Sequence, residues 1–208
     1  MNRIFLFLII SLFCHSAIGQ NYLEPIPPFD RTSYNEALLE SFIDNKDPEL
    51  WMIVKPSFEL PYAIILYSQS GKYYLTSVEA KEDIWKYKKV ENYHVLDIEP
   101  TKNVDIKSSS FKHDELQEVL ESWRSGLKLT RYSSKKRLGK DGTTYMFYSK
   151  NRLYGQTWSP EGGLALNFVK LGETLRQLVF SSDENKEKLL IQAHNLAKNI
   201  REYSPKKS

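Results

Sequence analysis

The sequence predicts an α+β fold, in which a mainly antiparallel sheet built from hairpins is packed by three to four helices. Two patterns predict it. Short runs rich in Tyr, Ile, Val and Leu are separated by turn sequences, which is typical of hairpin strands, and the segments after Ser110 repeat apolar residues at helical spacing. The composition of the 208 residues, 41% hydrophobic and 26% charged, is that of an ordinary globular protein rather than a disordered one.

The first expected element is a helix from about Tyr34 to Ile43. Ser33 and Glu36 have capping-box spacing at its start, and the polar residues 44–48 end it. Strands follow, and Gln69-Ser70-Gly71 is a good hairpin turn between the second and the third of them. The predicted strands in this half are 51–54, 62–68, 72–78, 93–98 and 104–106, with a short helix expected around Ile84, Trp85 and Tyr87.

The second half of the sequence is predicted to form a helix, a hairpin and two further helices. Asp114 and Glu115 near the start of the first helix and Gly126 near its end agree with helix-dipole and helix-ending preferences. Apolar bulk on both sides of the run Tyr145–Tyr148 suggests a strand that is covered on both faces. The predicted elements are a helix over 116–127, strands over 143–149 and 153–158, and helices over 164–178 and 189–200.

Residues 1–19 are typical of a secretory signal peptide. A basic start is followed by the apolar run Ile4–Phe13, and Ala17-Ile18-Gly19 places small residues before a cut that leaves Gln20 first. Because no later apolar run approaches the roughly 20 residues that span a bilayer, the sequence predicts a periplasmic or secreted protein without a stable membrane anchor. Residues 20–208 contain no repeat and no obvious linker, and we expect them to form a single α+β domain.

The only cysteine, Cys14, lies within the predicted signal. Bulky Phe13 before it disfavours lipidation, which requires small residues at that point. A mature chain without cysteine excludes disulfides, a cysteine nucleophile and thiolate metal ligands. Packing alone must then hold the exported domain together.

The histidines give no sign of a metal site or of catalysis. His94, His113 and His194 are scattered, and no pair has the spacing of a helical metal site, so no metal or cofactor is expected. No nucleophile elbow, phosphate-binding loop or dinucleotide motif is present. A Ser-His-Asp triad stays open, because its members can lie anywhere in a sequence.

The densest local signal for a site is the segment 155–163. In a functional interpretation, Trp158 stacks on a ligand and Glu161 is a general acid or base, with Asp141 as a nearby carboxylate. In a structural interpretation, Ser159 caps the following helix, Pro160 occupies its first turn and Glu161 lies at its positive end. The capping rules explain the segment more completely. The four tryptophans are likewise expected to be mostly core residues.

Charge is distributed unevenly, although the formal net charge is only +3. Residues 20–60 carry eight acidic side chains against three basic ones, whereas residues 124–152 carry nine basic side chains against Asp141 alone. Such a basic loop is usually solvated, but it is also the best candidate site for an acidic protein partner. Nucleic acid is not an expected partner of an exported protein of this kind. The partner-binding candidates are Arg131, Lys135, Lys136, Arg137 and Lys140.

The stretch Asp141-Gly142-Thr143-Thr144-Tyr145-Met146-Phe147, followed by Gly155-Gln156-Thr157-Trp158-Ser159-Pro160, resembles a pattern in small exported bacterial proteins of unassigned function. Trp51 with Pro56-Ser57-Phe58 looks like part of the same pattern. The resemblance implies a protein of the bacterial envelope, and it implies no catalytic residue.

Two functions follow as hypotheses. The first is an exported, periplasmic, non-catalytic binding protein whose partner is another protein, as in immunity proteins or enzyme inhibitors. The alternative is a cell-envelope hydrolase or glycan-binding protein that uses Trp158 and Glu161. A deep cleft with two facing carboxylates would favour the enzyme, whereas a flat charged or aromatic patch would favour the binding protein.

Overall fold

The computed structural model describes residues 21–26, 33–43, 47–90, 93–132 and 142–203, and it confirms the α+β class. The predicted signal peptide, Asp141 and the loop lysines and arginine at 135–140 lie outside the described residues. None of the described helices is long and apolar enough to cross a membrane. The elements are α2 (Ser33–Phe42), β1 (Leu50–Pro56), β2 (Tyr62–Gln69), β3 (Lys72–Ala80), β4 (Trp85–Val90), β5 (Tyr93–Ile98), β6 (Val104–Lys112), α3 (His113–Leu127), β7 (Thr143–Ser149), β8 (Leu153–Trp158), α4 (Gly163–Phe180) and α5 (Asp183–Glu202).

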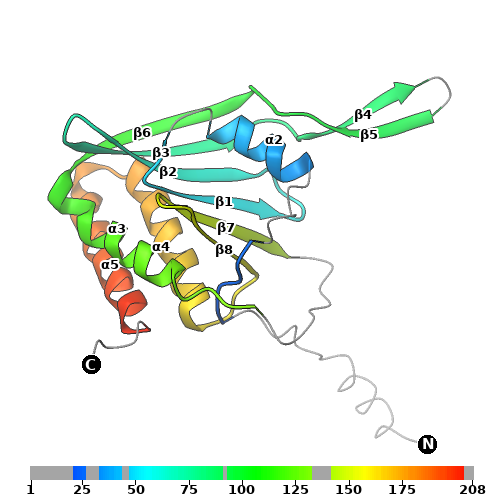
Figure 1. The fold of residues 1–208 in the computed structure, drawn as a ribbon. Helices are drawn as coiled ribbons and strands as arrows, with labels where there is room; N and C mark the ends of the chain where they lie inside the picture. Colours follow the sequence, from blue (N-terminus) through cyan, green and yellow to red (C-terminus); the bar gives the residue numbers. More distant parts are fainter. Residues whose placement is uncertain (1–20, 27–32, 44–46, 91–92, 133–141, 204–208) are drawn as a thin grey trace, which may run out of the picture.

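The six-stranded sheet is antiparallel throughout, in the order β6-β3-β2-β1-β7-β8 (Figure 1). The predicted turn between β2 and β3 is confirmed: Ser70 and Gly71 both have positive φ (51° and 75°), as a tight two-residue hairpin requires. β4 and β5 form a separate hairpin that projects beyond the sheet.

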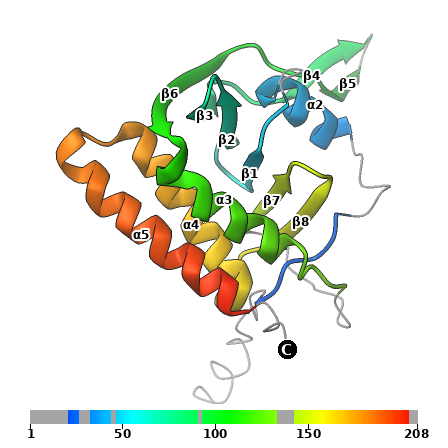
Figure 2. The same ribbon diagram turned by 60° about the vertical axis from the view of Figure 1, so that its left-hand side comes forward.

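Helices cover both faces of the sheet. α3, α4 and α5 lie on one face and α2 lies on the other (Figures 1 and 2). Successive side chains of β1 point to opposite faces of the sheet. Met52 therefore belongs to the core under the three helices, and Ile53 belongs to the core under α2. β7 does the same with Phe147 and Met146, so the prediction that this strand is covered on both faces is confirmed. Within the larger core, Trp123 of α3 is fully buried.

The short helix expected around Ile84, Trp85 and Tyr87 is wrong, because this segment forms β4 and pairs with β5. Ile84 is fully buried, and Trp85 stacks on Tyr34 of α2 with ring centroids 5.0 Å apart. Apolar residues at 84, 85 and 87 fit either period over so short a span. Trp85 remains 40% exposed and is therefore not the core residue that was expected.

The start of α4 differs from the predicted one. The helix begins at Gly163 with Gly162 as N-cap, so Ser159 is not the cap and Pro160 and Glu161 precede the first turn. Ser159 instead accepts a hydrogen bond on Oγ from the Thr143 N–H, 3.0 Å away, at the start of β7.

Residues 21–26, which we term the N-terminal strap, supply the missing cap of α4 and pair with one edge of the sheet at a single position. The Asn21 carbonyl accepts the Ala165 N–H at the start of α4. Gly163 has φ +63°, and a Cβ there would lie 2.4 Å from the Asn21 carbonyl oxygen, so only glycine fits. Glu24 and Gln156 exchange backbone hydrogen bonds of 2.8 and 2.7 Å, which pairs the strap with the outer edge of β8.

Candidate binding site

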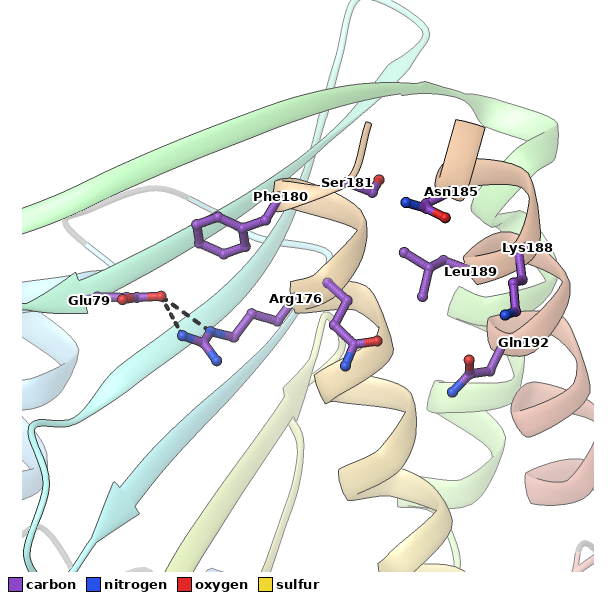
Figure 3. A pocket seen from close by; sticks show the side chains of 9 residues that line it. Glu79, Arg176, Phe180, Ser181, Asn185, Lys188, Leu189 and Gln192 are labelled. Atoms are coloured by element: carbon purple, nitrogen blue, oxygen red, sulfur yellow. Dashed lines mark hydrogen bonds and ion pairs between the residues drawn. The ribbon is translucent and has the colours of Figure 1, made fainter. Parts of the chain in front are cut away.

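An open groove with a volume of about 620 Å³ lies where α4 and α5 meet β3 (Figure 3). Helix α4 contributes one wall, the first turns of α5 contribute the other, and Glu79 of β3 closes one end. We term it the α4–α5 groove. Its lining residues are Glu79, Arg176, Gln177, Phe180, Ser181, Asn185, Lys188, Leu189 and Gln192.

Arg176 on α4 organises the closed end of the groove. Its Nη2 and Nε atoms donate to Glu79 Oε1 at 2.6 and 3.2 Å. Glu173, one turn earlier on α4, flanks the same guanidinium at 4.0 Å. The guanidinium also lies 4.4 Å from the centre of the Tyr62 ring. Two carboxylates and one aromatic face therefore hold this cation in place.

Tyr62 of β2 extends this network. Its hydroxyl donates to Glu173 Oε1 over 2.5 Å, and burial together with this hydrogen bond raises the pKa of Tyr62 well above its ordinary value of 10.0. The tyrosine therefore remains a neutral donor at physiological pH. Because Glu79 and Glu173 both engage Arg176 and Glu173 also accepts from Tyr62, both carboxylates at this end of the groove are engaged, and two carboxylates with one guanidinium leave it a formal charge of −1. It is not a pair of free carboxylates.

The rest of the groove presents groups suited to contact. Phe180, at the end of α4, is 44% exposed, and the Lys107 ammonium of β6 lies 4.7 Å from its ring centre. Lys188 is exposed and makes no ion pair with the described residues. Three amide side chains, Gln177, Asn185 and Gln192, lie among these groups. An exposed ring, cations and amides are typical of a surface that binds polar, acidic partners.

A smaller hollow of about 80 Å³ adjoins the groove and shares Glu79 and Phe180 with it. Ser77, Asp105 and Lys107 complete its lining. Ser77 is only 1% exposed, and its Oγ has no hydrogen-bond partner among the described residues. The hollow brings β6 into the same surface as the α4–α5 groove.

Neither Trp158 nor Glu161 lines the groove. Trp158 ends β8 opposite Thr144, where it is half-buried, and its indole packs over Gly142, at which a Cβ would lie 2.7 Å from the ring. Glu161 is exposed in the loop before α4. The structure thus gives Trp158 a packing role against the chain itself.

Of the predicted basic cluster, the structure places only Arg131. It is exposed, its N–H donates to the Leu23 carbonyl, and its guanidinium lies 4.9 Å from the Tyr22 ring centre. Arg131 therefore helps to hold the N-terminal strap. Lys135, Lys136, Arg137 and Lys140 stay untested candidates for partner binding, because they lie outside the described residues.

The histidine side chains that the structure describes make local contacts. His113 stacks on Tyr73 with centroids 4.8 Å apart. His194 of α5 lies between the Glu118 carboxylate and the Glu115 carbonyl of α3, each 3.0 Å from a ring nitrogen. Among the described residues, no group of three or more His, Cys, Asp and Glu side chains is arranged to hold a metal ion.

Comparison with family models, with curated proteins and with solved structures finds no match. The resemblance to small exported bacterial proteins therefore stays a prediction.

The groove residues were not among the candidates from the sequence. Arg176, Phe180 and Lys188 lie on helices whose apolar stripes were recognised, but polar residues between such stripes carry no signal of convergence. One sequence feature could have pointed to the groove. Phe180 falls immediately before the Ser181-Ser182 break between α4 and α5, where a helix end exposes a large apolar ring.

Proposed function

We propose that this chain is an exported, periplasmic, non-catalytic binding protein of the immunity or inhibitor kind, and that its protein partner is acidic. The observation that carries the proposal is the character of the α4–α5 groove. It is open, its carboxylate Glu79 is engaged by Arg176, and an exposed ring and a cation, Phe180 and Lys188, lie beside it. The groove is not the flat patch expected of a binding protein, but its openness and its exposed ring and cation support binding over a deep catalytic cleft.

The alternative, an envelope hydrolase or glycan-binding protein that uses Trp158 and Glu161, receives less support from the geometry. A retaining or inverting glycosidase needs a second carboxylate within about 5–10 Å of the first, on either side of the bond to be broken. Asp141, the nearby carboxylate suggested by the sequence, lies outside the described residues. Trp158 packs over Gly142 instead of standing free as a stacking platform.

Capture of a partner tests the proposal. The mature chain from Gln20 onward is immobilised and exposed to periplasmic extracts of its own source and of competing bacteria. Bound proteins are identified by mass spectrometry, and affinity is then measured with the purified partner. We expect Lys188→Glu to weaken binding several-fold, and added salt to weaken it in the wild type, since rim charges act through screened attraction.

Lys198→Glu is the matched control, because Lys198 is an exposed lysine of the same helix outside the groove. Equal losses in the two variants would indicate a general charge effect, and no loss in either would remove the groove from the proposal. Export is tested separately by intact-mass measurement. A mature chain that begins at Gln20 supports it, whereas a retained residue 1 or a lipid adduct on Cys14 contradicts it.

A further inference from the structure

The two edges of the sheet are treated differently. At the outer edge of β8, Gln156 exchanges both backbone hydrogen bonds with Glu24 of the N-terminal strap. β6 forms the other edge, and among the described residues β3 is its sole strand neighbour (Figure 1). β6 is nine residues long and contains no proline. A long unpaired edge of this kind is a template for an added strand.

The hydrogen-bond phase shows which backbone groups of β6 face outward. The Lys81 N–H donates to the Asn103 carbonyl, one step beyond the β3·β6 register, so the odd-numbered residues of β6 form the bonded pairs with β3. On the other side of β3, Ala80 bonds to Pro61, which is the opposite phase and confirms the assignment. The even-numbered residues of β6 therefore direct their N–H and C=O groups away from the sheet.

The two end residues of this outward row are already satisfied as donors. The Val104 N–H donates to the Lys102 carbonyl, and the Lys112 N–H donates to Glu115 Oε2. Ile106, Ser108 and Ser110 remain between them, each exposed, and Ile106 is 59% exposed. These three consecutive outward residues provide a free ladder of alternating donors and acceptors.

The charges beside this ladder favour one kind of occupant. On β6, Asp105 is paired with Lys81 at 3.9 Å, whereas Lys107 and Lys112 form no ion pair with the described residues. Lys72 of β3, directly opposite Lys112 in the register, adds a third such cation. Two copies paired antiparallel about Lys107 would bring this lysine against its own equivalent. An acidic strand would instead neutralise these cations.

We propose that the edge of β6 binds an extended acidic segment of the partner by strand addition, through the backbone of Ile106, Ser108 and Ser110. The proposal rests on the proposed function and specifies where and how the partner is held. Lys107 lies on β6 and over Phe180 in the α4–α5 groove, so an added strand would lie beside the groove. Main-chain bonds along the edge would supply affinity, and the lysines and the groove would supply selectivity.

A synthetic peptide tests the edge directly. The probe has the nine-residue length of β6, capped ends, and glutamate alternating with valine or threonine. It is titrated to about 1 mM into ¹⁵N-labelled mature chain. We expect the amide signals of Ile106, Ser108 and Ser110 to shift more than those of β8, and a lysine version of the peptide to leave them unmoved.

Ser108→Pro removes one outward N–H without touching the ladder to β3, a position where edge strands accept proline. We expect it to reduce peptide binding at least tenfold, whereas Ser108→Ala, which retains the N–H, binds as wild type. If Ser108→Pro does not fold, peptides with N-methylated backbone amides test the same hydrogen bonds from the side of the ligand. Methyl groups on one set of alternate residues should abolish binding to the wild type, and methyl groups on the other set should not.

Unchanged binding to folded Ser108→Pro, equal loss with both methylated peptides, or equal binding of the lysine peptide would overturn the proposal. So would a concentration-dependent dimer that Ser108→Pro abolishes, since the occupant would then be a second copy. If the partner from the capture experiment binds wild type and Ser108→Pro equally, strand addition fails and the proposed function stands. If no partner is captured while the peptide binds at β6, the proposed function fails instead.

Discussion

Two buried glycines allow a quantitative test of the packing between the helices and the sheet. A Cβ added at Gly126 of α3 would lie 2.3 Å from Phe168 Cε2 and 2.7 Å from Ile200 Cγ2, at the point where α3, α4 and α5 meet. A Cβ added at Gly172 of α4 would lie 2.3 Å from Met52 Sδ on β1. Both contacts are too short, so a neighbour must move in each Gly→Ala variant. The two variants differ in whether the neighbour can do so.

The expected magnitudes follow from that difference. Alanine gains up to about 1 kcal/mol of helix propensity over glycine, and overpacking costs about 1–3 kcal/mol. At Gly126 the obstructing ring of Phe168 is itself held by Trp123 and Phe147, with centroids 5.0 and 5.4 Å away, so little relief is available. We therefore expect Gly126→Ala to destabilise by about 1–2 kcal/mol. At Gly172 the obstructing side chain is a flexible methionine, and we expect a change within about 1 kcal/mol of wild type.

Urea unfolding of the mature chain measures both free energies. Similar m-values in the three proteins would show that the same surface is exposed on unfolding, so that the midpoints can be compared. The expected order of midpoints is Gly126→Ala lowest, with Gly172→Ala close to wild type. Gly126→Ala at or above the wild-type midpoint, or Gly172→Ala as the weaker of the two variants, would refute this account of the packing.

Three further predictions concern single side chains. Burial and the hydrogen bond to Glu173 raise the pKa of Tyr62 in the folded state, so the stability that this group contributes is lost as pH rises from the unfolded pKa through the folded pKa. The free energy of unfolding should therefore fall above pH 10, and fall less steeply in Tyr62→Phe. Urea unfolding at a series of pH values measures this, and an equal fall with pH in the two proteins would contradict it. Ser159→Ala removes the acceptor of the Thr143 N–H and should lower the free energy of unfolding by about 1 kcal/mol, with faster hydrogen exchange at the Thr143 amide. Faster exchange in the first turn of α4 instead would show that Ser159 caps that helix. Arg152 has φ +60°, a left-handed backbone conformation that costs a residue with a Cβ about 1–2 kcal/mol and costs glycine little. Arg152→Gly should therefore raise Tm by a few degrees, whereas Arg152→Ala should not.

The fold class and most elements could be predicted from the sequence because each has a period of its own. The β2–β3 hairpin has its glycine turn, and α3 and α4 have apolar stripes longer than two turns. Where a period was too short to decide, as at Ile84 and Trp85, the pairing of β4 with β5 determined the structure. Such pairing is set by partners distant in the sequence and leaves no local mark.

The start of α4 shows a second limit. Ser159-Pro160-Glu161 satisfies the local rules for a helix start, yet the helix begins later, at Gly163. The cap comes from the Asn21 carbonyl, well over a hundred residues earlier in the chain. A cap from so far away cannot be found from neighbouring residues. The α4–α5 groove escaped prediction for the same reason, because Glu79 and Arg176 meet only in the fold.

The N-terminal strap makes the pairing of the β8 edge depend on residues 21–26. With the strap in place, the sheet offers one open edge, and strand-to-strand association through that edge ends once it is filled. An aminopeptidase that removed the strap would uncover β8 and leave the start of α4 without the Asn21 carbonyl. A sheet open at both edges can add a neighbour on each side without closure, which is the geometry of a growing filament. Limited trimming would thus leave unpaired backbone groups at both edges of the sheet.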